Sequence, residues 1–535
     1  MRSRAAALVI MLAIIAVALA ARLDRLGAQQ LWADEALTVV TSGFDTLRLW
    51  FAPIDPTPGF YFSLHHLLFG DAADPATVRS LSVAMAVALV PAIYWLVRAM
   101  LPVSVSLLAA ALVALNGTMV DYAQEARAYA LVLLLLTVAA RALIGWDSSS
   151  ERSLRWSWLF VVSATLAAYT HLVGTIVLAG ELALIVVLAA SRRPIAWRGL
   201  IVMLLPSLLV LPEIARLNAF ATGSQGFDWL PAADVAETLY NQAYLLSPAG
   251  MLGPDGLPNP AVPLDPFGYA GILLVWIGST LLLRRAALRR FIAEHRAAAA
   301  VMALFLLFPL TLFAIGQLAR PVLTLRTSLP FLIGAIPLIA LTASLDVKPW
   351  RGLVIATLLI LVPSAFGLAR GAGRHQKEDW ARVVAILKAE ARPGDIVIGC
   401  SLITFPTLNA AAEPRGGVSL PMLINYGGRE VLAARTIGAT GWAAKFREPL
   451  WSGYIAGQEN AVIGRAPTIA LPMRRLWIAY SACEPADRAR IERLVGGATA
   501  KRRWWIDRTL FHAVTGLDRF DLSQPVFIRV PEPAA

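Results

Sequence analysis

Eleven long apolar segments constrain the fold more than any other feature of the sequence. A membrane-spanning helix needs about 20 mostly apolar residues. Across the 535 residues, 58% are apolar and only 15% are charged, whereas soluble domains carry about 25% charged residues. We therefore expect a polytopic α-helical membrane protein with about 11 transmembrane helices. The segments are centred near Ile14, Ala86, Ala109, Leu134, Ser163, Leu182, Leu205, Leu273, Leu306, Ile336 and Leu358.

The positive charges predict how the chain is oriented. The net charge is +12, but most of it falls in short loops on one side of the expected membrane, and cytoplasmic loops carry such an excess of positive charge. We expect the N-terminus inside, in the inner (plasma) membrane. This distribution excludes a nucleic-acid partner. The expected partner of these loops is the lipid bilayer. The inner-loop cations include Arg98, Arg141, Arg155, Arg192, Arg193, Arg198, Arg284, Arg285, Arg289, Arg290, Arg296, Lys348 and Arg351.

This topology divides the chain into two parts. Residues 1–373 form the transmembrane module, with long outer loops at 22–76 and 216–266, and an odd number of spans places residues 374–535 outside. That tail has strand-like runs at 396–398 and 477–479, and apolar residues at helical spacing from Trp380 to Leu387. We expect a small extracytoplasmic α/β domain there. The first span resembles a secretory signal, but its length favours a retained anchor.

The first outer loop carries two adjacent carboxylates, Asp34 and Glu35, which follow Trp32 just beyond a span. Neighbouring helical residues point in different directions, so the two carboxylates should not share one proton. One of them could act as a general base, while the other orients a ligand or binds a cation. The alternative is an acidic start to an interfacial helix, stabilised by the helix dipole.

The next outer turn brings ionisable residues to the start of a span, where burial is expensive unless they serve a cavity. Glu125 and Tyr129 share one helical face, while Arg127 points nearly opposite. A regular helix could therefore not aim Glu125 and Arg127 at one ligand atom. Either this start is non-helical or the two have different roles. The alternative is a snorkelling arginine with a tyrosine belt.

Other polar residues lie at the outer ends of spans. His171 sits at a reversal between two spans, where a helix-capping role is the alternative to a catalytic one. Arg326 precedes a late span and could meet an anionic lipid headgroup or could snorkel. Glu181 falls mid-span and needs a partner or a polar cavity. The sequence has no phosphate-binding loop, no dinucleotide fingerprint and no metal-ligand spacing of Cys or His.

The order of these motifs resembles that of the bacterial GT-C glycosyltransferases. The segments WADEA (32–36), DPTPGFY (55–61), QEARAY (124–129) and YTH (169–171) are similar to the family 39 group, which is related to protein O-mannosyltransferases and the lipid A aminoarabinose transferase. Arg326 falls where that group often has an arginine. The family often has a Pro-Pro pair where this chain has Pro58 and Gly59, and His or Glu is common near Asp55.

The resemblance implies transfer of a sugar from a polyprenyl-phosphate donor to an extracytoplasmic acceptor, which is a lipid, a polysaccharide or a protein. Asp34 would be the general base, and Glu35 would be the second catalytic carboxylate. Arg127 and Arg326 would stabilise charge on the leaving phosphate. The sugar and phosphate site would be shaped by Glu35, Gln124, Glu125, Tyr129, Asp55 and His171.

The resemblance fixes no cofactor, and a divalent metal at Asp34 and Glu35 stays open. The main rival function is a transporter or flippase of a lipid-linked substrate, which also needs many spans and buried charges. Such transporters often show two similar halves, and this sequence shows no such repeat.

Overall fold

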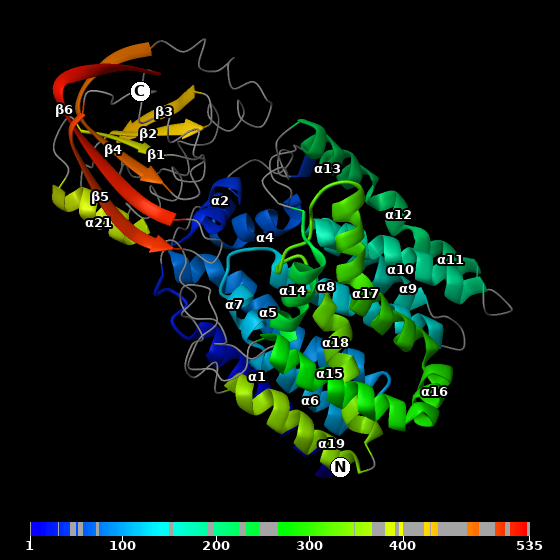
Figure 1. Cartoon of the computed structure of the whole chain (residues 1–535). Coiled ribbons are helices and arrows are strands. Elements are labelled where there is room, and N and C mark those ends of the chain that lie inside the picture. Colours follow the sequence, from blue (N-terminus) through cyan, green and yellow to red (C-terminus); the bar gives the residue numbers. More distant parts are fainter. Residues whose placement is uncertain are drawn as a thin grey trace.

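The structure is a computed structural model of the whole chain, and it describes most of the helical part together with an α/β part near the C-terminus (Figure 1). The described residues are 2–29, 31–42, 50–51, 57–70, 74–148, 154–190, 197–223, 232–246, 266–346, 348–365, 380–390, 395–399, 422–427, 430–436, 468–480, 498–508 and 514–531.

The chain is a polytopic helical membrane protein. Six of the described helices are long and apolar enough to cross a membrane, or up to eight if each of two bent pairs is one span. Shorter apolar helices account for the remaining expected segments, so the predicted count of eleven spans is not confirmed. The long helices include α1 (Arg2–Leu23), α5 (Pro75–Arg98), α8 (Tyr129–Ser148), α10 (Leu172–Ala190) and α17 (Arg296–Leu318).

Several expected spans are broken or short. A bend of 56° separates α6 (Val103–Leu115) from α7 (Gly117–Ala123), and a bend of 84° separates α15 (Pro266–Leu283) from α16 (Arg285–Glu294). The span near Leu205, Trp197–Ala219, is one of the six, although short interruptions divide it into α11 (Trp197–Leu204), α12 (Pro206–Leu209) and α13 (Leu211–Gly223). The shorter apolar helices are α9 (Leu154–Ala168), α18 (Phe331–Leu345), and α19 (Pro349–Ala356) with the π-helical turn η1 (Thr357–Leu361).

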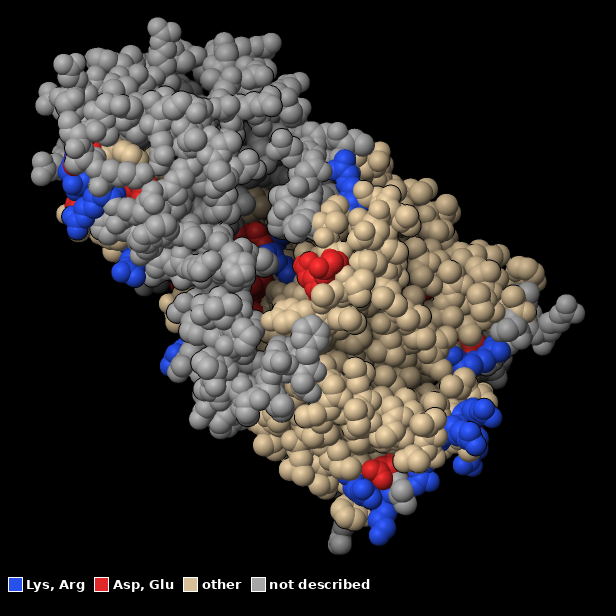
Figure 2. Space-filling model, viewed as in Figure 1, with Lys and Arg blue, Asp and Glu red and all other residues tan. Residues whose placement is uncertain are grey.

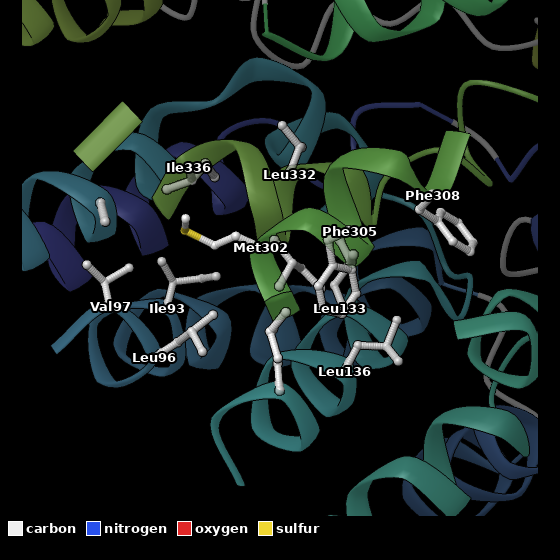
Figure 3. Packing of buried hydrophobic residues seen from close by; sticks show 14 of the residues in the cluster. Ile93, Leu96, Val97, Leu133, Leu136, Met302, Phe305, Phe308, Leu332 and Ile336 are labelled. Carbon is white, nitrogen blue, oxygen red and sulfur yellow. The ribbon is translucent and has the colours of Figure 1, made fainter. Parts of the chain in front are cut away.

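The centre of the bundle is where α5, α8, α17 and α18 meet. Of the apolar stretch of α8, 78% is buried, against 11% for α1. Because a helix that faces protein on all sides is buried all round, α8 is central, and α1 leaves most of its apolar surface for lipid. Figure 3 shows the side chains that fill this centre: Ile93, Leu96, Val97, Leu133, Leu136, Met302, Phe305, Phe308, Leu332 and Ile336.

Short helices in the two long loops approach the bundle beside the ends of its spans. The first loop contributes α2 (Ala33–Ser42) and α4 (Gly59–Phe69), and the second contributes α14 (Val235–Leu246). The backbone N–H of Phe60 donates to the carbonyl of Tyr169, 3.1 Å away, at the α9–α10 reversal. Trp50 packs on the rings of Phe60 and Tyr169. These contacts fix α4 against the bundle.

The C-terminal part combines one helix with a mixed six-stranded sheet of order β3-β2-β1-β4-β6-β5. The strand β1 runs parallel to β2 and to β4, while the other pairings are antiparallel. The elements are α21 (Trp380–Glu390), β1 (Ile396–Gly399), β2 (Met422–Gly427), β3 (Glu430–Thr436), β4 (Thr468–Tyr480), β5 (Ala498–Arg508) and β6 (Val514–Pro531).

The helix from Trp380 and the strands at 396–398 and 477–479, which the sequence predicts, are confirmed. The apolar face of α21 is buried, and Trp477 of β4 is buried in the same apolar cluster. Asp395 ties the start of β1 to β4, because its carboxylate accepts from Arg475 at 2.9 and 2.6 Å and from the indole N–H of Trp477 at 2.8 Å. The predicted boundary at residue 373 lies outside the described residues.

A close helix contact gives the first prediction. A Cβ added at Gly334 of α18 would lie 2.7 Å from the carbonyl oxygen of Met302 and 2.9 Å from the backbone nitrogen of Leu306, both in α17. Gly334→Ala should therefore lower the free energy of unfolding by about 1–3 kcal/mol, the usual cost of overpacking. Thermal unfolding in detergent measures the loss.

The matched control for this prediction is Gly278→Ala in α15, where an added Cβ meets nothing within 4 Å. This substitution should be neutral or slightly stabilising, because alanine is the better helix former. Equal unfolding temperatures for the two variants would contradict the close packing of α17 on α18.

Candidate active site

The site begins at α2, whose first turn places Asp34 opposite an arginine from a distant part of the chain. Arg326, in the turn before α18, donates to a carboxylate oxygen of Asp34 at 2.5 Å. The same guanidinium lies 5.2 Å from the ring of Trp32 and reaches the hydroxyl of Tyr129 at 3.4 Å. The first long loop, the start of α8 and the segment before α18 therefore meet at one point.

Arg127 places a second guanidinium beside α2. Residues 124–128 are not helical, which settles the alternative left open by the sequence. Arg127 is 7% exposed, and its Nη2 donates to the hydroxyl of Thr57 at 3.2 Å. Its Nη1 lies 3.4 Å from the hydroxyl of Thr38 and 3.5 Å from the backbone carbonyl of Asp34. Asp34 thus has two arginines beside it.

The arginines control the charge of Asp34. Burial alone would raise the pKa of this carboxyl, but the charges of Arg326 and Arg127 and the hydrogen bond from Arg326 outweigh burial and lower the pKa below its ordinary value. The side chain of Asp34 remains 22% exposed, so its carboxylate is partly accessible. Figure 2 shows acidic and basic side chains close together in a hollow on this face of the molecule.

Glu35 lies deeper and is held by the scaffold. Its fully buried carboxylate forms a bidentate pair with Arg79 of α5, with both N–O distances 2.7 Å. It also accepts from the backbone N–H of Ala126 at 3.0 Å and of Trp32 at 3.3 Å. One side chain therefore joins α2, α5 and the segment that carries Arg127. These contacts hold parts of the chain together, and the Glu35 side chain has no exposed surface.

Tyr129 and His171 form a neutral polar wall beside Arg326. Their rings are 5.4 Å apart, and Tyr122 packs edge-on against Tyr129 at 5.2 Å. Burial, together with the nearby charges of Arg127 and Arg326, lowers the pKa of His171 to about 3. Its Nδ1 accepts the backbone N–H of Val173 at 3.2 Å, so His171 caps α10 and the proton of its neutral ring is on Nε2.

The structure also places most of the remaining predicted residues. Gln124 donates to the carbonyls of Arg22 and Asp24, at 3.1 and 2.7 Å, and so holds the end of α1. Glu125 is buried, at 4% exposure, in the segment that carries Arg127. Asp55 lies outside the described residues. Glu181 is fully buried in α10, and its carboxyl has no hydrogen-bond partner among the residues that the structure describes.

Sequence reasoning did not select Arg79 or Thr57 for the site. Arg79 was visible as a cation near the start of an apolar span, a position where an ionisable residue usually has a partner, but nothing in the sequence connected it with Glu35. Within the part of the chain that is described, no group of three or more His, Cys, Asp or Glu side chains is placed to hold a metal ion.

The buried pair gives the second prediction. Arg79→Met would leave the carboxylate of Glu35 buried without its charge partner, which costs about 3–5 kcal/mol. We expect a large fall in the unfolding temperature, measured in detergent. Arg502 pairs with Glu390 at 3.3 Å but is 58% exposed, so Arg502→Met should cost less than about 1 kcal/mol. Similar losses in the two variants would contradict the structural role of the buried pair.

Comparison with known proteins bears on the fold. No protein-family profile matches the sequence, and no curated protein matches it. The crystal structure of ArnT from Cupriavidus metallidurans bound to undecaprenyl phosphate matches with a TM-score of 0.54 and 12% identity, covering 95% of this chain and 97% of that one. The structure of the same protein in the apo state has a TM-score of 0.55 and 11% identity, with the same coverage. At these identities the match shows the fold alone: the chain has the fold of ArnT, in agreement with the GT-C resemblance of its sequence motifs.

Proposed function

We propose that the protein is a membrane glycosyltransferase that moves a sugar from a polyprenyl-phosphate donor to an extracytoplasmic acceptor. The observation that carries the proposal is the placement of Asp34 beside Arg326 and Arg127 at a partly open site. Glycosyl transfer from a lipid phosphate needs a base for the acceptor and cations for the leaving group. The ArnT fold supports this function, because the matching ArnT structure has undecaprenyl phosphate bound.

In the proposed reaction, Asp34 accepts the proton of an acceptor hydroxyl. The hydroxyl oxygen forms a bond to the anomeric carbon of the donor sugar as the bond from that carbon to the phosphate oxygen breaks. The bonding electron pair leaves with the phosphate, and Arg127 and Arg326 stabilise the developing negative charge. The base is already ionised at neutral pH, because the two guanidinium groups lower the pKa of Asp34.

Arg326 has a double role in this proposal. Its guanidinium is paired with Asp34 at 2.5 Å. A donor phosphate competes for the same guanidinium, since arginine binds phosphate and carboxylate through similar hydrogen bonds. When Arg326 turns toward the phosphate, Asp34 loses its hydrogen-bonded cation and becomes a better base. Donor binding would thus activate the residue that deprotonates the acceptor.

The neutral wall suits the sugar. Tyr129 offers a hydroxyl beside Arg326, and His171 carries its ring proton on Nε2 because Nδ1 is occupied by the cap of α10. Both side chains can hydrogen-bond sugar hydroxyls without adding charge. Glu125, buried nearby, belongs to the same proposed pocket, while Glu35 and Gln124 orient the segments that form it.

The proposed reaction requires the site to face the extracytoplasmic side of the membrane. On that side, activated sugars are supplied on lipid carriers and not as nucleotide sugars. We place the C-terminal domain on that side of the inner membrane, because the arginine-rich loops favour the opposite side as cytoplasmic. The acceptor is a lipid, a polysaccharide or a protein with a free hydroxyl.

The third prediction tests the base. Asp34→Asn should reduce turnover by about 100- to 10,000-fold, the usual contribution of a positioned general base, without lowering the unfolding temperature. The assay uses purified protein, a polyprenyl-phosphate sugar and mass spectrometry of released polyprenyl phosphate. Asp74→Asn is the matched control: Asp74 is exposed and caps α5 through the N–H of Thr77 at 3.0 Å, and asparagine caps equally well.

Normal turnover by Asp34→Asn would contradict the assignment of Asp34 as the general base. Translocation of the intact lipid-linked sugar across liposomes by the wild-type protein, without release of polyprenyl phosphate, would favour the transporter or flippase instead. A deletion strain analysed by mass spectrometry of its surface glycans should lack one specific substituent, which would identify both the sugar and the acceptor.

The fourth prediction concerns pH. Arg326 lowers the pKa of Asp34, so Arg326→Gln should raise that pKa and move the acidic limb of the kcat/KM profile to higher pH. Arg326→Lys keeps the charge and should leave the limb closer to its wild-type position. An unchanged acidic limb in Arg326→Gln would contradict the electrostatic coupling, whatever the loss of overall rate.

A further inference from the structure

A second charged surface lies at the other end of the bundle, on α16. Figure 1 shows α16 at the end of the helical bundle away from the β-sheet. The helix follows α15 after a bend of 84°. If α15 crosses the membrane, α16 therefore runs close to the membrane plane. Its ten residues, RAALRRFIAE, combine arginines with a few large apolar side chains.

The two kinds of side chain separate around the helix. Arg285, Arg289 and Arg290 are exposed, whereas Phe291 is buried at 7% exposure and packs against the ring of His295 at 5.1 Å. Leu288 packs against the main apolar core. An amphipathic helix with arginines on its polar face is the pattern of a helix that lies in the membrane interface.

Among the residues that the structure describes, no carboxylate lies within ion-pair distance of Arg285, Arg289 or Arg290. The next arginine along the chain, Arg296, differs because it pairs with Asp147 at 3.3 Å. Arginines four positions apart, such as Arg285 and Arg289, repel each other on a helix. An external anion would relieve this repulsion.

Exposed apolar side chains adjoin the same arginines. Leu282 and Leu283, at the end of α15, are 72% and 81% exposed, and Ile292 of α16 is 45% exposed. Figure 2 shows basic side chains grouped at this margin of the molecule beside a broad uncharged surface. A free phosphate ion would satisfy the charges but not the apolar neighbours. A lipid supplies both an anionic headgroup and acyl chains.

We propose that α16 is a binding site for anionic phospholipid headgroups, in the leaflet at the end of the bundle opposite the candidate active site. Arg285, Arg289 and Arg290 bind the headgroup phosphates, while the exposed leucines contact the acyl chains. The proposal is independent of the glycosyltransferase function, because it uses none of the residues near Asp34.

The test uses the full-length protein in mild detergent, with native mass spectrometry to measure bound phosphatidylglycerol and phosphatidylcholine. The wild-type protein should retain phosphatidylglycerol in preference to phosphatidylcholine. Each arginine near an anionic lipid surface strengthens binding by roughly fivefold. The variant Arg285→Gln/Arg289→Gln/Arg290→Gln should therefore bind phosphatidylglycerol about 100-fold more weakly, with little change for phosphatidylcholine.

The matched control is Arg4→Gln/Arg198→Gln/Arg351→Gln, which removes three exposed arginines from separate helices and should keep most of the preference. In lipid-free detergent, both variants should unfold no earlier than the wild type. The proposal would be overturned if the α16 variant bound as much phosphatidylglycerol as the wild type. It would also be overturned if the control variant lost as much phosphatidylglycerol binding as the α16 variant. Displacement of the lipid by inorganic phosphate alone would also overturn it, because that result identifies a simple anion site.

Discussion

The placement of Asp34 beside two guanidinium groups is the interaction on which the candidate site depends. A carboxylate at the edge of an apolar bundle would ordinarily become protonated, because burial disfavours its charge. Arg326 at 2.5 Å and Arg127 nearby reverse that tendency and keep the carboxylate ionised. The same three groups have the charges that transfer from a phosphate leaving group requires, so the electrostatics that keep Asp34 ionised also suit the proposed chemistry.

The geometry of that arrangement comes from Glu35 and Arg79. Their pair, buried and bidentate, fixes α2 to α5, and the hydrogen bond from the N–H of Ala126 fixes the segment that carries Arg127. Adjacent acids in one sequence motif thus have different surroundings: Asp34 is partly open and faces arginine side chains, whereas Glu35 is enclosed by scaffold donors. This division explains how a short loop helix can hold the carboxylate of Asp34 in a constant position.

Local periodicity was enough to predict the apolar segments, the reversal at residues 169–171 and the helix at residues 380–387. It did not predict the 56° bend between α6 and α7, because the direction of a new helix depends on tertiary contacts. In the site, Asp34, Arg127 and Arg326 could be selected one by one, since ionisable side chains at the ends of apolar spans are costly without a role. Their meeting could not be derived from spacing, because 292 positions separate Asp34 from Arg326. The partner of Glu35 was missed for the same reason: helix packing specifies such pairs, and no local pattern does.

The most direct test of the central claim is an experimental structure of the protein in a lipid nanodisc with a polyprenyl phosphate bound. The account predicts phosphate oxygens within hydrogen-bond distance of both Arg127 and Arg326, with the carboxylate of Asp34 released from Arg326 and facing the open side of the site. A phosphate bound at another part of the bundle, with the pair of Asp34 and Arg326 intact, would contradict it.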